Sequence, residues 1–273
     1  MKCEWDKLLM ILPPRMRSKV DKLGKEGLQE LRIRQGRPTE MVTRSGSKWL
    51  EDVGTVEDML FVVNTSSKYS PWAAESISDG YVTAPGGHRV GICGEVTRHN
   101  GCISGIRHPT SICIRVARDF PGIAARGKHV PGNILIIGPP GSGKTTLLRD
   151  WIRQITDAVT VVDERNELFP PNGQFDPGLK TDVLSGCDKP KGVEIALKTM
   201  GPETIAVDEI TSNEDCLALI QAGWCGVRLL ATAHAATVLD LKGKMIYRKL
   251  LETGLFAHII VLQKDKSWSV EKL

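Results

Sequence analysis

The stretch Gly138-Pro139-Pro140-Gly141-Ser142-Gly143-Lys144-Thr145 decides the fold of this 273-residue chain. It matches the phosphate-binding pattern G-x-x-x-x-G-K-[ST] at every required position. The apolar run before it, residues 134–137, has the length of a buried strand. After it, apolar residues recur at helical spacing over residues 146–152. A strand, a glycine-rich loop and a helix are the context in which this pattern binds phosphate.

Each part of the motif predicts a contact with a nucleotide. We expect the phosphates to rest on the backbone of residues 138–145 and of Thr146, because glycines expose N–H groups and a helix N-terminus attracts anions. Lys144 is predicted to reach the β- and γ-phosphates of ATP. The Thr145 hydroxyl is predicted to ligate Mg²⁺.

Length and composition fit two ordinary globular domains. Hydrophobic residues make up 41% and charged residues 25% of the chain, which allows a real core and a hydrated surface. Residues 1–130 hold 20 Lys and Arg against 14 Asp and Glu, whereas residues 131–273 hold 16 against 18. This modest asymmetry predicts two different surfaces, not a strongly basic nucleic-acid binder. No apolar run of 18 residues and no signal peptide are seen, so we expect a cytoplasmic protein.

The hydrophobic pattern changes near residue 125. Before it, short alternating segments and a hairpin around residues 84–87 predict an α+β domain with an antiparallel sheet, over residues 1–125. A Pro- and Gly-rich stretch, residues 120–132, marks the boundary. From residue 126 to 273, strands alternate with helices, which predicts an α/β domain with a parallel sheet covered on both faces. The strands are expected at residues 133–137, 159–163, 204–208, 227–232 and 257–262, and the helices near residues 144–155, 191–200, 213–222 and 241–252.

Acidic and polar residues follow three of the predicted strands, and in a parallel sheet these strand ends share one edge. The strand at residues 204–208 ends in Asp208 and Glu209. We assign Asp208 to the Mg²⁺ shell and Glu209 to the general base that activates water. Asp163 and Glu164 end a second strand and are expected to orient water or metal. Thr232 and His234 end a third, where they could sense the γ-phosphate.

Four motifs in this order resemble the secretion-type ATPases, the RecA-like hexameric motors of type II and type IV secretion and of pilus retraction. They are the phosphate loop, the acidic box at residues 163–167, the Walker B segment at residues 202–210 and the histidine box at residues 230–235. The chain departs from the family at Asp208, where Gly is usual, and at Thr211, where Arg is usual. The resemblance implies a homo-oligomer, in a ring such as the hexamers of those motors.

Further segments extend the resemblance over nearly the whole chain, to the stage III sporulation AA family of endospore-forming bacteria. They are residues 31–38, 80–83, 86–94 and 162–165. This implies an ATPase of the mother-cell cytoplasm, recruited peripherally to a channel between mother cell and forespore, with membrane proteins of the sporulation apparatus as partners. The superfamily also implies that an arginine of the N-terminal domain contacts phosphate, for which Arg115 fits best and Arg118, Arg107 and Arg89 are reserves.

Two other functions stay open at this point. A RecA-like nucleic-acid motor is permitted by the basic N-terminal half, although clustered aromatic residues and a basic tract are lacking. An ATP-binding assembly protein with little hydrolysis is permitted by the departures at Asp208 and Thr211. We favour a Mg²⁺-dependent ATPase with Lys144, Glu164, Glu209, His234 and Arg115 as catalytic residues.

Overall fold

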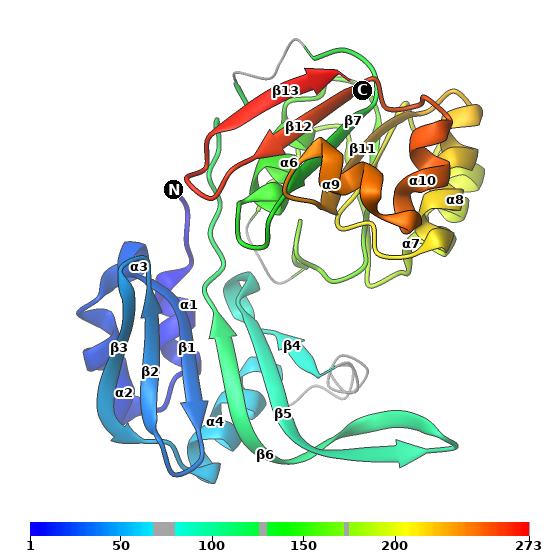
Figure 1. Cartoon of the computed structure of the whole chain (residues 1–273). Helices are drawn as coiled ribbons and strands as arrows, with labels where there is room; N and C mark the ends of the chain where they lie inside the picture. The colour runs from blue at the N-terminus through cyan, green and yellow to red at the C-terminus, as the bar shows by residue number, and fades with distance from the viewer. Residues whose placement is uncertain (68–79, 126–129, 172–174, 273) are drawn as a thin grey trace. The chain divides into compact units, whose positions relative to one another are not determined.

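The computed structural model describes residues 1–67, 80–125, 130–171 and 175–272, with the side chain of residue 102 left aside. Its contacts divide the chain into two compact units. The first is Met1–Asp119 with Pro170–Gln174, and the second is Phe120–Phe169 with Phe175–Leu273. Each unit has its own core and is described by itself below (Figure 1).

The first unit is an antiparallel sheet packed against short helices, as predicted. Its elements are α1 (Trp5–Ile11), α2 (Pro14–Asp21), α3 (Gly24–Gly27), β1 (Leu28–Arg34), β2 (Pro38–Thr43), β3 (Gly46–Val53), α4 (Val56–Ser67), β4 (Tyr81–Thr83), the 3₁₀ turn η1 (Pro85–Gly87), β5 (Arg89–His99) and β6 (Cys102–Arg115). The strand order is β3-β2-β1-β6-β5-β4. In Figure 1, β5 and β6 form a long hairpin.

Alternation along β1 shows why this sheet has one dry face. Leu31 and Ile33 are fully buried, whereas Arg32 and Arg34 between them are partly exposed. The buried side chains join those of α1, α2 and α4 in one hydrophobic core. The strands β2 and β3 were not predicted from the sequence, because Pro38, Glu40 and Lys48 obscure the alternation there.

The second unit is a mostly parallel sheet with helices on both faces. Its elements are β7 (Ile134–Gly138), α6 (Lys144–Arg153), β8 (Val159–Asp163), β9 (Thr181–Ser185), α7 (Lys189–Ile195), the π-helical turn η3 (Ala196–Met200), β10 (Thr204–Val207), α8 (Asn213–Trp224), β11 (Arg228–His234), α9 (Val238–Gly243), α10 (Met245–Glu252), β12 (His258–Leu262) and β13 (Trp268–Lys272). The order is β13-β12-β7-β11-β10-β8-β9, and every neighbouring pair is parallel except β12 with β13.

Both faces of this sheet are buried at its centre, which explains why its central strands, such as β7, β8 and β10, are largely apolar. Along β7, Leu135 and Ile137 join a core with α8 and α10, whereas Ile134 and Ile136 join a core with α6. The five predicted strands are present, and the fold class is confirmed. Three details differ from the prediction: edge strands β9 and β13 are added, the helix expected at residues 191–200 ends in η3, and the helix expected at residues 241–252 is α9 and α10, separated at Lys244, whose ψ is 116°.

Candidate nucleotide site at the carboxyl edge of the C-terminal sheet

The glycine-rich loop joins the end of β7 to the start of α6. Gly141 and Gly143 have φ angles of 72° and 103°, in a backbone region that residues with a Cβ rarely adopt. A Cβ built on Gly141 would meet no atom within 4 Å. The loop therefore leaves its backbone accessible where α6 begins, which is the geometry that binds phosphate.

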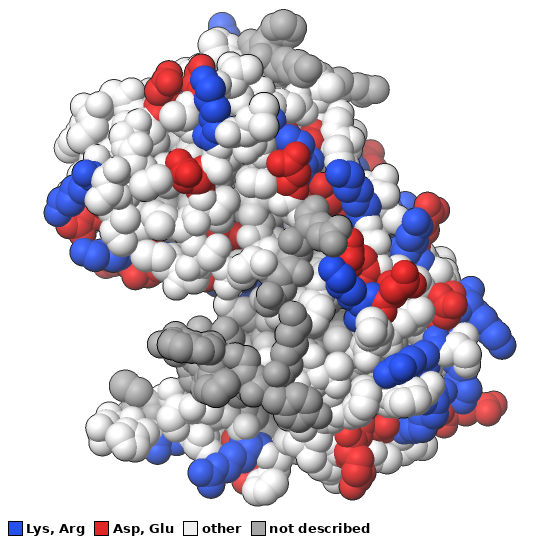
Figure 2. Space-filling model, turned by 180° about the vertical axis from the view of Figure 1, so that it is seen from behind, with Lys and Arg blue, Asp and Glu red and all other residues white. Residues whose placement is uncertain are grey.

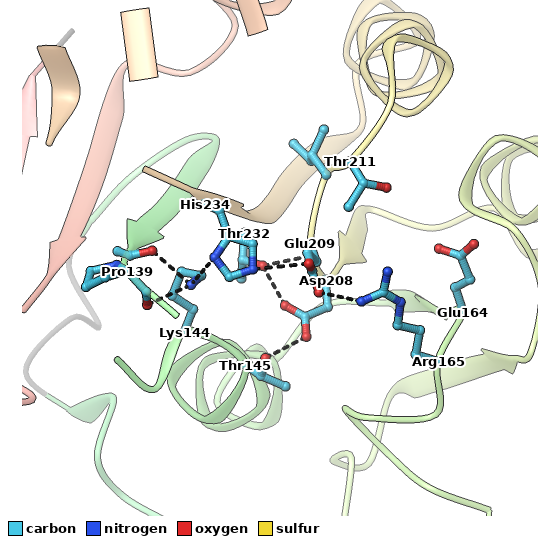
Figure 3. A network of polar contacts seen from close by, with 12 residues as sticks. Pro139, Lys144, Thr145, Glu164, Arg165, Asp208, Glu209, Thr211, Thr232 and His234 are labelled. Carbon is cyan, nitrogen blue, oxygen red and sulfur yellow. Dashed lines mark hydrogen bonds and ion pairs between the residues drawn. The ribbon is translucent and has the colours of Figure 1, made fainter. Parts of the chain in front are cut away.

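The Lys144 ammonium links the loop to the end of β11. It donates to the carbonyl oxygens of Gly138 at 2.9 Å and Pro139 at 3.2 Å, and lies 3.0 Å from His234 Nδ1 (Figure 3). Burial lowers the pKa of Lys144, and the charges of Asp208 and Glu209 oppose this shift. The motif lysine thus lies between the phosphate loop and the acids of β10.

Asp208, which directly follows β10, connects the end of that strand to α6 and to β11. Its Oδ2 accepts a hydrogen bond from the Thr145 hydroxyl at 2.7 Å, and its Oδ1 accepts one from the Thr232 hydroxyl at 2.5 Å. The Thr232 oxygen in turn accepts the backbone N–H of Glu209 at 2.7 Å. Thr232 is fully buried, so in this structure it holds the end of β10 beside β11 and positions both acids.

Glu209 follows Asp208 in a left-handed conformation, with φ at 54°. Such a backbone is strained for a residue with a Cβ and is concentrated at functional sites. The carboxylate lies 3.1 Å from His234 Nε2 through one oxygen and 2.9 Å from Arg165 Nη1 through the other (Figure 3). A chain of polar contacts therefore runs from Lys144 through His234 and Glu209 to Arg165.

Asp163 and Glu164, the two acids at the end of β8, make different contacts. Both oxygens of Asp163 accept backbone N–H groups, those of Glu167, Leu168 and Phe169, at 2.8–2.9 Å. Burial raises the pKa of Asp163 to about 6. This carboxylate holds the following loop in shape.

Glu164 forms an ion pair with the buried ammonium of Lys189, which also lies 3.8 Å from Asp215. Glu164 shares a small cavity with Glu209 and Asp208, but the structure shows no direct contact of its carboxylate with theirs (Figure 3). A role for Glu164 in orienting water stays a prediction.

Arg115 lies at the end of β6 in the first unit, where its Nε is 3.3 Å from Glu30. Of the reserve arginines, Arg118 donates to the carbonyls of Lys25 and Leu28, and Arg89 lies over the Tyr81 ring, 4.1 Å from its centroid. In the second unit, one network of contacts connects Lys144, Thr145, Asp208, Glu209 and His234, and Glu164 lines the same small cavity as the two acids. Contact of Arg115 with phosphate stays a prediction.

Two residues of the site, Arg165 and Lys189, were not identified from the sequence. Arg165 directly follows Glu164 at the shared edge of the parallel sheet, and that position was the signal that could have identified it. Lys189 begins α7, after the helix cap Asp188. Its pairing depends on how α7 packs on β8, and the sequence carries no sign of that contact.

The donor set fits magnesium. The Thr145 hydroxyl and the Asp208 carboxylate are hard oxygen ligands lying 2.7 Å apart beside the phosphate loop. Among the described residues, no group of three or more His, Cys, Asp or Glu is arranged to hold a metal ion. Mg²⁺ suits such a site, because it commonly takes one or two protein ligands together with substrate phosphates.

The surface carries charges of both signs. On the face shown in Figure 2, the Lys and Arg side chains alternate with Asp and Glu side chains. Among the described residues on this face, no continuous basic stripe is seen, which is the usual mark of a nucleic-acid surface. Within the described ranges, none of the helices combines the length and apolar character needed to cross a bilayer.

Fold and site together define a RecA-like phosphate-loop protein with the architecture of the secretion ATPases. The Legionella pneumophila ATPase DotB superposes with a TM-score of 0.55 at 17% identity, over 95% of this chain and 79% of DotB. The pilus retraction motor PilT, solved with bound ADP, gives a TM-score of 0.59 at 18% identity, over 89% of this chain and 76% of PilT.

At the level of sequence, the chain belongs to the family described as "Sporulation stage III, protein AA", whose family model matches residues 4–270. Stage III sporulation protein AA of Bacillus subtilis (strain 168) is 35% identical over 94% of this chain and 90% of that protein. The family expected from the sequence is confirmed.

Proposed function

We propose that this chain is a Mg²⁺-dependent ATPase that hydrolyses ATP to ADP and phosphate. The observation that supports this most is the continuous polar chain from Lys144 through His234 to Glu209, beside the Thr145–Asp208 pair. These contacts join the phosphate loop to the two acids at the end of β10. Binding and bond cleavage would therefore take place at one sheet edge.

Each residue has a role that follows from its contacts. The backbone of residues 138–146 binds phosphate oxygens, and the Lys144 ammonium exchanges its carbonyl partners for the β- and γ-phosphates. Thr145 and Asp208 hold Mg²⁺, which when bound neutralises charge on the phosphates. Glu209 accepts the proton of the attacking water. His234 contacts both Lys144 and Glu209, so a shift of the lysine toward phosphate is transmitted to the base.

The remainder of the proposal concerns assembly. Arg115 of the first unit would stabilise charge on the transferred phosphoryl group, because a guanidinium fork matches phosphate oxygens. Supplying that arginine from a neighbouring copy would require a homo-oligomeric ring. Membership of the sporulation family supports a role beside membrane proteins of a channel joining mother cell and forespore, with the chain recruited peripherally from the cytoplasm.

Phosphate release from Mg·ATP, measured over a range of protein concentrations, tests this function. We expect specific activity to rise steeply with concentration, because a neighbouring copy completes the site. Activity should disappear in Lys144→Ala, and also when EDTA removes the metal.

The controls separate the alternatives. Flat, nonzero activity would contradict the ring, and stimulation of several-fold by single-stranded DNA would favour a nucleic-acid motor. Nucleotide-dependent assembly with negligible phosphate release would favour the binding-only protein.

A further inference from the structure

A second lysine lies at the phosphate loop, and no sequence motif includes it. Lys266, in the turn between β12 and β13, donates from its ammonium to the carbonyl oxygen of Gly141. Its Cδ is 3.8 Å from the position that a Cβ on Gly143 would take. The side chain therefore lies along the loop, with its positive charge at the fourth residue of the motif.

The position of this turn is set by the fold. β12 pairs in parallel with β7, with Val261 opposite Ile137, so the hairpin leaves the sheet next to the loop. The Lys266 N–H donates to the Gln263 carbonyl at 3.1 Å, and the Gln263 N–H donates to Ser267 at 2.9 Å. The Trp268 ring lies 6.3 Å from that of Trp151 on α6. The turn is thus fixed both to the strand before the loop and to the helix after it.

The two lysines approach the loop from opposite flanks. β7 lies between β11 and β12 in the sheet. Lys144 contacts His234 at the end of β11, on the side of Asp208 and Glu209. Lys266 comes from the β12 side. If hydrolysis takes place on the β10–β11 side, the γ-phosphate lies on that side of the loop. The other end of the phosphate chain, the α-phosphate next to the ribose, then lies on the β12 side.

We propose that Lys266 is a nucleotide-binding residue whose ammonium contacts the α-phosphate of a nucleoside di- or triphosphate. This rests on the proposed nucleotide site, but assigns a residue outside its motif. The α-phosphate is present in both ADP and ATP and keeps its bonds during hydrolysis. Lys266 should therefore stabilise ground state and transition state equally, which affects KM and not kcat.

The test is the affinity for Mg·ADP, measured by calorimetry on the full chain. Lys266→Gln keeps most of the stem and removes the charge, and should weaken ADP binding about tenfold, as expected for a lost charge-assisted hydrogen bond. Lys266→Arg should stay near wild type. Lys264→Gln is the matched control, because it removes the same charge from the same turn. The salt dependence of ADP binding should be shallower in Lys266→Gln alone.

The outcomes are distinguishable. Equal ADP affinity in wild type, Lys266→Gln and Lys264→Gln would overturn the assignment of Lys266 and leave the proposed function standing. Equal weakening in both Gln variants would show a general effect of charge and also overturn it. A wild-type chain that binds no ADP would overturn the assignment together with the proposed function. A loss of kcat with unchanged KM in Lys266→Gln would contradict the α-phosphate contact.

Discussion

Charged side chains gather in two regions of this chain, and the comparison shows what makes such a cluster a site. On the N-terminal sheet, Arg32 pairs with Glu30 and Arg34 with Glu40, at 2.7 and 2.8 Å. At the carboxyl edge of the C-terminal sheet, Glu209 pairs with Arg165 and His234 at similar distances. Residue types and distances are alike, so they do not distinguish the two regions.

The difference lies in what surrounds the pairs. Those on the N-terminal sheet alternate with core residues along a strand and share a face that is only partly exposed, much like the C-terminal pairs. Those on the C-terminal sheet converge beside a glycine-rich loop and are connected to a buried lysine. Parallel strands bring polar ends from distant parts of the sequence to one edge. The comparison predicts large effects on turnover at that edge and small effects on the partly exposed face of the N-terminal sheet.

The largest expected effect is from Glu209→Gln. It removes the proton acceptor but keeps the shape of the side chain, so kcat should fall by about 10⁴-fold while Mg·ADP affinity stays near wild type. Steady-state phosphate release and ADP calorimetry measure the two quantities. Unchanged kcat would show that Glu209 is one more paired carboxylate, like Glu30.

The second effect tests whether one charged residue of the N-terminal sheet, Arg115, takes part in catalysis. Arg115→Ala should lower kcat about 10³-fold if Arg115 acts on the transferred phosphoryl group. Arg32→Ala is the matched control, since Arg32 binds the same Glu30, and it should turn over ATP at the wild-type rate. Equal losses in both variants would point to the fold of the sheet and contradict the role of Arg115.

The third effect is on stability at the C-terminal edge. Burial raises the pKa of Asp163 from 3.8 to about 6, so between these values the folded chain keeps a proton that the unfolded chain loses. The stability contributed by this group therefore falls as the pH rises from about 4 to about 6, and is constant above that. The measured quantity is the free energy of unfolding of the wild type minus that of Asp163→Asn. This difference should fall by up to about 3 kcal/mol as the pH rises across this window. Urea unfolding at several pH values measures it, and a constant difference would contradict the shift.

The smallest effect is on the partly exposed face of the N-terminal sheet. Arg34→Ala breaks the pair with Glu40, and because the Arg34 side chain still reaches water, the pair should contribute no more than about 1 kcal/mol. Urea unfolding should therefore change little, and salt should reduce the change further. A loss of several kcal/mol would show that this pair is a buried structural element and contradict the comparison.

The sequence predicted the parts of the molecule that depend on local pattern. The apolar run of β7, the glycine-rich loop and the helix after it are present, and the parallel sheet follows from strands alternating with helices. β9 and β13 were missed because they are edge strands: Asp182 and Ser185 in β9, and Ser269 and Glu271 in β13, are exposed and give no apolar run. The break between α9 and α10 was missed because apolar spacing continues across Gly243.

In the site, residues that end strands could be predicted, but their partners could not. Asp208, Glu209 and His234 follow apolar strands, which is a local signal. Arg165, Lys189 and Lys266 gain their contacts only when β8, α7 and the β12–β13 turn are placed in space. The same local signal predicted that Asp163 orients water or metal, and in the structure its oxygens accept three backbone N–H groups.

Single-turnover hydrolysis of radiolabelled Mg·ATP, with protein in excess, tests the central claim most directly, because it measures the chemical step apart from product release. We expect wild type to convert bound ATP in one phase, and Glu209→Gln to bind ATP and leave it intact over the same time. Equal conversion by both proteins, or binding without conversion by wild type, would contradict a catalytic site at the carboxyl edge of this sheet.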